Sequence, residues 1–93
     1  MYVVTVAFEI EPGQMQAFLP LMNENARTSK DVEPDCLQFD VCVDDAGVFL
    51  YEVYRHREGF DAHLNSYHFR TFDAAVARMV TGKQVRVFER VTR

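Results

Sequence analysis

The residues of this sequence that could do chemistry are a few polar side chains placed on otherwise apolar faces. Phe18, Met22, Asn25 and Ser29 follow one another at spacings of four, three and four, so one face of a helix carries all of them. Asn25 and Ser29 therefore point toward the interior, where an unbonded amide or hydroxyl costs free energy. They could bond a substrate oxygen. The alternative is structural, with Ser29 capping the helix end or bonding back to a carbonyl.

Histidine is the second candidate for chemistry. Phe60, His63, Leu64 and Tyr67 share a face of a second helical region, which puts His63 on its buried side, and His68 follows Tyr67 directly. A histidine in an apolar pocket is expected to be neutral near pH 7 and able to accept or donate one proton. The alternative is a core histidine bonded to a backbone carbonyl.

Two carboxylates fall inside predicted strands. Asp40 lies mid-strand, and Glu52 alternates with apolar neighbours. An acidic side chain on a partly apolar face needs a partner, such as Arg86 or Arg90 of the last strand or a histidine, and the structural alternative is an ion pair across strands or across a dimer. The alternative is an acid, a base or an orienting group at the cavity between sheet and helices.

Several chemistries find no support in the residue spacing. Two histidines five residues apart share a helix face poorly, and no cysteine or aspartate completes a zinc site. There is no glycine-rich phosphate loop, no G-x-S-x-G elbow and no CxxC pair. His56 lies in a charged stretch and is expected to be exposed. We therefore expect no metal and no cofactor, and a small substrate held in an apolar pocket by a few polar groups.

The elements that must position these residues follow from periodicity. Alternation predicts strands over residues 2–10, 36–43, 48–55 and 84–91, and spacings of three and four predict helices over 14–30 and 58–79. We expect the second helical region to break near residues 66–68, Pro20 to kink the first helix or shift its start, and residues 44–47 to form a tight hairpin. The order β-α-β-β-α-β is the ferredoxin-like arrangement of the α+β class, with a four-stranded antiparallel sheet in one domain over residues 1–93.

The second strand is expected to place Cys36 and Cys42 on one face, opposite Phe39. Six residues of strand span about 20 Å, too far for a disulfide. Reduced thiols, together with a sequence that begins as a strand without a leader pattern, predict a cytoplasmic location.

Apolar residues on both sides of the predicted sheet suggest a partner. Val3 and Ala7 lie opposite the alternating apolar row of the first strand, and 48% of all residues are hydrophobic. Helices can cover one face of the sheet, and a second copy of the chain is the simplest cover for the other, so we expect a homodimer. A net charge of −4, with no polybasic run and no long apolar run, argues against nucleic acid and membrane partners.

The order of several short motifs resembles the antibiotic biosynthesis monooxygenase family over nearly the whole chain. They are Asn25-Ala26-x-x-Ser29, Glu33-Pro34-x-Cys36-Leu37-x-Phe39-Asp40-Val41, Tyr51-Glu52-x-Tyr54, Phe60-x-x-His63-Leu64 and His68-Phe69. The resemblance implies a ferredoxin-like homodimer whose sheets pack face to face as a dimeric α+β barrel. It also implies that the chain oxidises a small quinol, aromatic or ketone substrate with O₂ and without metal or flavin.

Under that resemblance His63 is the base, Asn25 orients the substrate oxygen, and His68 and Ser29 assist. The substrate-binding wall would comprise Phe18, Phe39, Glu52, Tyr54 and Phe60. An isomerase of a phosphorylated ketone of the autoinducer-2 type would use the same base, with Arg27, Lys30 or Arg70 for the phosphate. A non-catalytic ligand-binding dimer is the third possibility, whereas haem degradation is disfavoured because the chain has no Trp.

Overall fold

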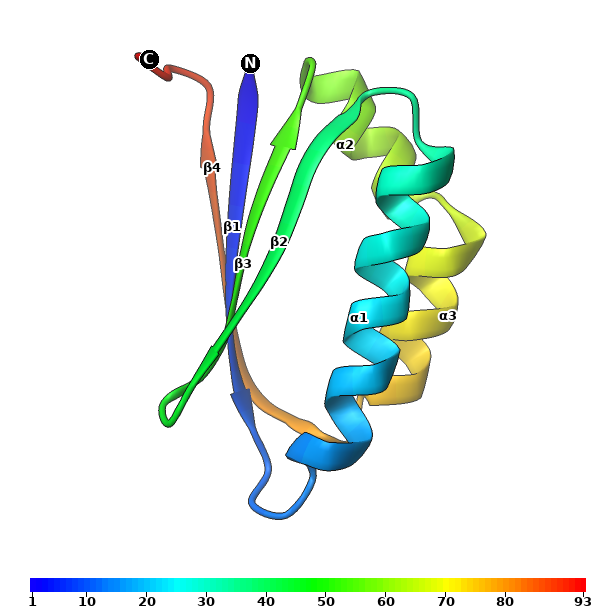
Figure 1. Cartoon of the computed structure of the whole chain (residues 1–93), viewed down its shortest axis with the longest axis vertical. Helices are drawn as coiled ribbons and strands as arrows, with labels where there is room; N and C mark the ends of the chain where they lie inside the picture. The colour runs from blue at the N-terminus through cyan, green and yellow to red at the C-terminus, as the bar shows by residue number, and fades with distance from the viewer.

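The structure, a computed structural model, describes residues 1–93. The elements run in the order β1 (Tyr2–Ile10), α1 (Met15–Val32), β2 (Cys36–Asp44), β3 (Gly47–Tyr54), α2 (Arg57–Leu64), α3 (Tyr67–Val76) and β4 (Val80–Phe88). The strands form one antiparallel sheet in the order β2-β3-β1-β4, and the helices all lie on one face of it (Figure 1). The α+β, ferredoxin-like prediction is confirmed, with the second helical region divided into α2 and α3.

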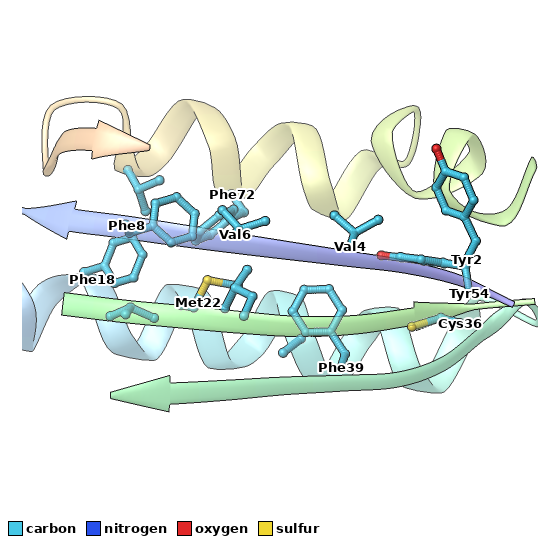
Figure 2. Packing of buried hydrophobic residues seen from close by; sticks show 14 residues of the cluster. Tyr2, Val4, Val6, Phe8, Phe18, Met22, Cys36, Phe39, Tyr54 and Phe72 are labelled. Atoms are coloured by element: carbon cyan, nitrogen blue, oxygen red, sulfur yellow. The ribbon is translucent and has the colours of Figure 1, made fainter. Parts of the chain in front are cut away.

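The core fills the space between the sheet and the helices (Figure 2). Phe18 and Met22 of α1 are fully buried, as their spacing predicts, and the Phe18 ring meets Phe8 of β1 edge-on at a centroid distance of 5.3 Å. The same ring lies 5.9 Å from Phe72 of α3. Phe18 therefore joins both long helices to the sheet, and it fixes α1 so that its buried stripe faces inward. None of the helices is long and apolar enough to cross a membrane.

The break between α2 and α3 comes where the sequence predicts it. The Ser66 hydroxyl accepts a hydrogen bond from the backbone N–H of Phe69 at 3.2 Å, which caps the start of α3, and it donates to the carbonyl of His63 at 2.7 Å. A single helix would have separated His63 from His68 by about half a turn in angle. The break instead lets the two histidines come from different helices and approach the same point.

The predicted face of Cys36 is wrong. The register of β2 against β3 shifts between Cys36 and Gln38, so the strict alternation of side chains is lost there. Cys36 consequently joins Phe39 in the core, while Cys42 stays exposed, and both thiols are free.

The predicted start of the last strand is also wrong, because β4 begins at Val80 rather than at residue 84. Val80 pairs with Ile10 and Gly82 pairs with Glu9, across an irregularity in β1 between Glu9 and Ile10. Pairing with β1 from Val3 to Ile10 outweighs the weak strand preferences of Gly82 and Lys83. α1 runs through Pro20 from Met15 and continues to Val32, two residues beyond the predicted end.

The predicted hairpin between β2 and β3 is confirmed. An Asp44 carboxylate oxygen accepts hydrogen bonds from the N–H groups of Ala46 and Gly47, at 2.8 and 3.2 Å. Gly47 has a φ of 148°, and a Cβ there would lie 2.2 Å from the carbonyl oxygen of Phe8. Only glycine fits this close approach of β3 to β1.

Candidate functional site

One buried carboxylate joins the two histidines. A single oxygen of Glu33 (Oε2) lies 2.8 Å from His63 Nδ1 and 2.5 Å from His68 Nε2. The His63 side chain is 3% exposed, that of Glu33 10% and that of His68 18%. His63 comes from α2, His68 from α3, and Glu33 directly follows α1. The structure therefore brings the two candidate histidines, His63 and His68, together through Glu33, which is not among the predicted site residues.

Glu33 could have been predicted as a site residue by continuing the buried face of the first helix beyond Ser29 by one more turn. It lies four residues after Ser29, on the same face as Asn25 and Ser29. Its backbone N–H donates to the carbonyl of Ser29 at 3.1 Å, so the last turn of α1 holds it. What spacing could not supply is its partners, which come from residues 30 and 35 positions further along the chain.

The hydrogen bonds around His63 define which ring nitrogen carries the proton. The Ser29 hydroxyl donates to the carbonyl of Asn25 at 2.8 Å, so toward His63 Nδ1, 3.3 Å away, it can only accept. The ionised Glu33 carboxylate is also an acceptor. Both neighbours of Nδ1 therefore require a proton on that nitrogen, and in the neutral ring Nε2 is left as a free base. Ser29 back-bonds to its own helix, as one alternative predicted, and touches the histidine as well. The partner of His63 is a carboxylate rather than the carbonyl of the simple core alternative.

The charge of Glu33 is held by these contacts. Burial by itself would raise the pKa of the Glu33 carboxyl, but hydrogen bonds and positive charge from His63 and His68 outweigh it, so the pKa is lowered. The other oxygen, Oε1, is buried and has no hydrogen-bond partner. Glu33 is thus an anion that can stabilise positive charge on either imidazole.

A small cavity of about 40 Å³ lies beside His63, between the sheet and the helices. Of the predicted site residues, its lining contains Asn25, Phe39, Glu52, Phe60 and His63. The side-chain oxygen of Asn25 is buried and has no hydrogen-bond partner. An acceptor left unbonded in an apolar cavity costs about 1–3 kcal/mol, which a hydroxyl-bearing ligand would return.

The other predicted residues surround the cavity without lining it. Phe18 packs in the core, and Ser29 and Tyr54 lie behind the lining. His68 lines a separate groove of about 190 Å³ between α1 and α3, and this groove shares Asn25 and Phe72 with the cavity. His56 is exposed on the surface, next to Asp35 and Glu58, as predicted.

Neither Asp40 nor Glu52 forms an ion pair with an arginine of the same chain. The expectation of such an ion pair within the chain is therefore wrong. Glu52 is buried and accepts a hydrogen bond of 2.6 Å from the Tyr54 hydroxyl, and burial raises its pKa more than this bond lowers it. Burial, with the neighbouring Glu52 charge, also raises the pKa of Tyr54. Asp40 is exposed and accepts from the Gln38 side chain at 2.6 Å. Alternation indicated that Glu52 needs a partner. That partner is Tyr54, two residues further along the same face of β3.

The arrangement suits proton transfer. The cavity is lined by His63, whose Nε2 has no hydrogen bond and whose Nδ1 is backed by a buried carboxylate, and by Asn25, whose amide oxygen has no partner. A base oriented in this way removes a proton from an acidic O–H or C–H group, and the carboxylate stabilises the resulting imidazolium. Glu33, His63 and His68 are also the only group whose composition and proximity could hold a metal ion.

Fold and site together define a ferredoxin-like α+β domain with a buried carboxylate–histidine cluster on an internal cavity. The family model for antibiotic biosynthesis monooxygenase matches residues 1–75, and the chain belongs to this family. A comparison with curated proteins finds no match.

Solved structures of similar proteins have the same fold. A Nitrosomonas europaea protein that carries the family name is 26% identical, with 99% of this chain and 100% of that chain covered and a TM-score of 0.89. Rv0793 from Mycobacterium tuberculosis is 25% identical, with 99% and 96% covered and a TM-score of 0.90.

Proposed function

We propose that this protein is a cofactor-independent monooxygenase that oxidises a small quinol, phenolic aromatic or ketone with O₂. The observation that carries the proposal is the His63 imidazole, held at Nδ1 by Glu33 and Ser29, with Nε2 free of hydrogen bonds beside an apolar cavity. Membership of the antibiotic biosynthesis monooxygenase family supports this class of reaction.

In the proposed reaction His63 Nε2 takes a proton from the activated CH₂ or O–H of the substrate. The substrate anion passes one electron to O₂, and the two radicals combine into a peroxide, which takes the proton back from the imidazolium. Loss of water then converts CH₂ plus O₂ into C=O plus H₂O, so all atoms and electrons balance. The apolar lining, including Phe39 and Phe60, excludes solvent that would quench the anion.

The substrate oxygen is proposed to bond Asn25. Its unpartnered side-chain oxygen accepts from a hydroxyl and not from a carbonyl, so a phenol or an enol satisfies it. Asn25 borders both the cavity and the α1–α3 groove. A benzene ring needs roughly 150 Å³. The groove, at about 190 Å³, is large enough for a ring, and the inner cavity, at about 40 Å³, is not. We place the ring in the groove, with its reacting carbon reaching past Asn25 into the cavity that His63 lines, where O₂ also binds.

The test is oxygen uptake by chelator-treated protein with a panel of quinols, anthrones and phosphorylated ketones, with products identified by mass. His63→Ala should abolish uptake, and His56→Ala, which removes an exposed histidine, should leave it unchanged. Circular dichroism checks that both variants are folded. Full turnover by a folded His63→Ala protein would overturn the assignment of the base.

The same panel of substrates tests the alternative that the protein is an isomerase of a phosphorylated ketone. That reaction would need no oxygen, and its product would have the same mass as the substrate. Two of the three cations expected to hold its phosphate are engaged elsewhere, which disfavours it. Lys30 Nζ donates to the carbonyl of Leu37 at 2.8 Å, and an Arg70 guanidinium nitrogen to Asn65 at 3.3 Å. Binding without turnover of any compound would leave the non-catalytic alternative.

We also propose that the protein is a homodimer formed through the sheet face opposite the helices. Phe49 alternates with the buried Val48 and Leu50, so it lies on that face, and it is 44% exposed. Its partners across the sheet, Ala7 of β1 and Cys42 of β2, are also exposed on this face, and a contiguous apolar patch of this kind is typical of an interface. Phe49→Asp should convert the dimer to a monomer in sedimentation experiments, and a wild-type monomer would contradict this assignment.

A further inference from the structure

We propose that Glu33, His63 and His68 form a binding site for a divalent transition metal ion of the Zn²⁺ or Co²⁺ type. Two imidazole nitrogens and one carboxylate oxygen are a ligand set that such ions favour. The proposed oxygenase chemistry uses only Nε2 of His63 and no metal, so this site lies beyond it.

The three ligand atoms have the right proximity. All lie within 4.8 Å of one another, and the nitrogens lie 2.8 and 2.5 Å from the Glu33 oxygen. Ligands bind zinc at about 2.0–2.2 Å, so two ligand atoms on one ion lie roughly 3–4 Å apart. The nitrogens must therefore move away from the oxygen by less than about 1 Å, a displacement within the reach of side-chain rotation.

The surroundings of the cluster include a donor that is not used. The ligands come from three places in the fold: α2, α3 and the residue directly after α1. Glu33 Oε1 is buried without a partner, so the carboxylate has a second oxygen available to an ion. Ser29 Oγ, 3.3 Å from Nδ1, stands directly behind the ligand set.

The site is reached from one side. His63 is sealed, whereas the His68 side chain is 18% exposed and lines the α1–α3 groove. An ion can therefore enter from the groove and keep a water molecule there as a further ligand, as catalytic zinc sites do.

The ion and the proposed base share one imidazole. The ion replaces the proton on His63 Nδ1 and leaves Nε2 without a ligand. The hydrogen-bonded and metal-bound forms of the cluster are consequently alternatives, and the metal-bound form withdraws electron density from the ring.

The test uses the chelator-stripped full chain and does not depend on turnover. Co²⁺ is added while its visible absorption bands are recorded, and Zn²⁺ binding is measured by calorimetry. We expect one ion per chain and an increase in the melting temperature on binding. Loss of a residue that merely orients a ligand weakens metal binding about 10–100-fold, and His68→Gln, which removes a ligand, should weaken it at least as much. His68→Gln is the main variant because its partly exposed side chain can be changed without opening the core, and Glu33→Gln is the second.

The matched control is His56→Ala, because His56 also lies near two carboxylates but on the surface. Its ring nitrogens are 3.7 Å from an Asp35 carboxylate oxygen and 3.3 Å from a Glu58 carboxylate oxygen. This variant should bind Co²⁺ and Zn²⁺ as the wild type does. Absence of binding by the wild type would overturn the proposal. Binding that is lost in His56→Ala and retained in folded His68→Gln would also overturn it, by placing the ion at the surface cluster. Because no activity is measured, failure of the metal site and failure of the oxygenase proposal are distinguishable.

Discussion

Replacing Glu33 by glutamine tests whether the charge of the carboxylate holds the two histidines. The side chain keeps its shape and one acceptor oxygen, so the hydrogen bonds from His63 Nδ1 and His68 Nε2 become neutral ones. A hydrogen bond to a charged group contributes about 1.5–3 kcal/mol and a neutral one about 0.5–1.5 kcal/mol, so the loss is about 1 kcal/mol per bond. An amide is cheaper to bury than a carboxylate, which returns part of this. We expect a net loss of about 1–2 kcal/mol, or a fall in melting temperature of roughly 5–15 °C for a chain of this size.

The assay is urea unfolding at pH 7, with long-range proton–nitrogen NMR of the imidazoles. In the wild type, His63 should show its proton on Nδ1, and in Glu33→Gln that preference should weaken. The matched control is Asp35→Asn, two residues away. The Asp35 side chain is 35% exposed and pairs with Arg55 at the surface, at 3.3 Å, so its charge contributes little to stability.

A Glu33→Gln protein whose free energy of unfolding equals that of the wild type, with the His63 proton still on Nδ1, would refute the reasoning. An equal loss in Asp35→Asn would also refute it, because the effect would then come from general charge and not from the buried cluster.

Three further perturbations follow from the packing and from the buried acid. Phe18→Ala should lower the free energy of unfolding by about 3–5 kcal/mol, because a fully buried ring between two helices and the sheet is lost; a urea midpoint close to that of the wild type would show that the ring is not central to the core. Gly47→Ala should destabilise by more than about 1 kcal/mol, since its Cβ would lie 2.2 Å from the Phe8 carbonyl oxygen, and thermal melts that match the wild type would contradict this. Burial raises the pKa of Glu52, so the folded state holds this proton more tightly than the unfolded state does. The stability of the wild type relative to Glu52→Gln should therefore be greatest below the usual carboxyl pKa. It should fall as pH rises toward the raised pKa, by at most about 1.4 kcal/mol per pH unit. Urea titrations from pH 4 upward that give a constant difference in the free energy of unfolding would contradict this prediction.

Local patterns predicted the elements and the inward faces because these depend on near neighbours in the sequence. The spacing from Phe18 to Ser29 placed four buried side chains correctly, and the alternation of β1 gave its bounds, Tyr2–Ile10. The break expected near residues 66–68 is also present, between α2 and α3.

Long-range pairing decided the features that spacing missed. Cys36 is in the core because of a register shift against β3, and β4 begins early because β1 offers it a partner as far as Ile10. Glu33 is at the centre of the site because the end of α1 lies against the break between α2 and α3. Local sequence patterns cannot predict that contact. The surroundings of Glu52 were missed for a different reason, since its partner Tyr54 is only two residues away and a tyrosine was not considered as one.

The most direct test of the central claim, that His63 starts an oxygenation, is turnover under oxygen-18 gas by chelator-treated protein, with the product analysed by mass spectrometry. We predict that one labelled oxygen atom enters the organic product and the other enters water, and that folded His63→Ala forms neither product. An organic product without label, or equal labelling by folded His63→Ala, would contradict the account.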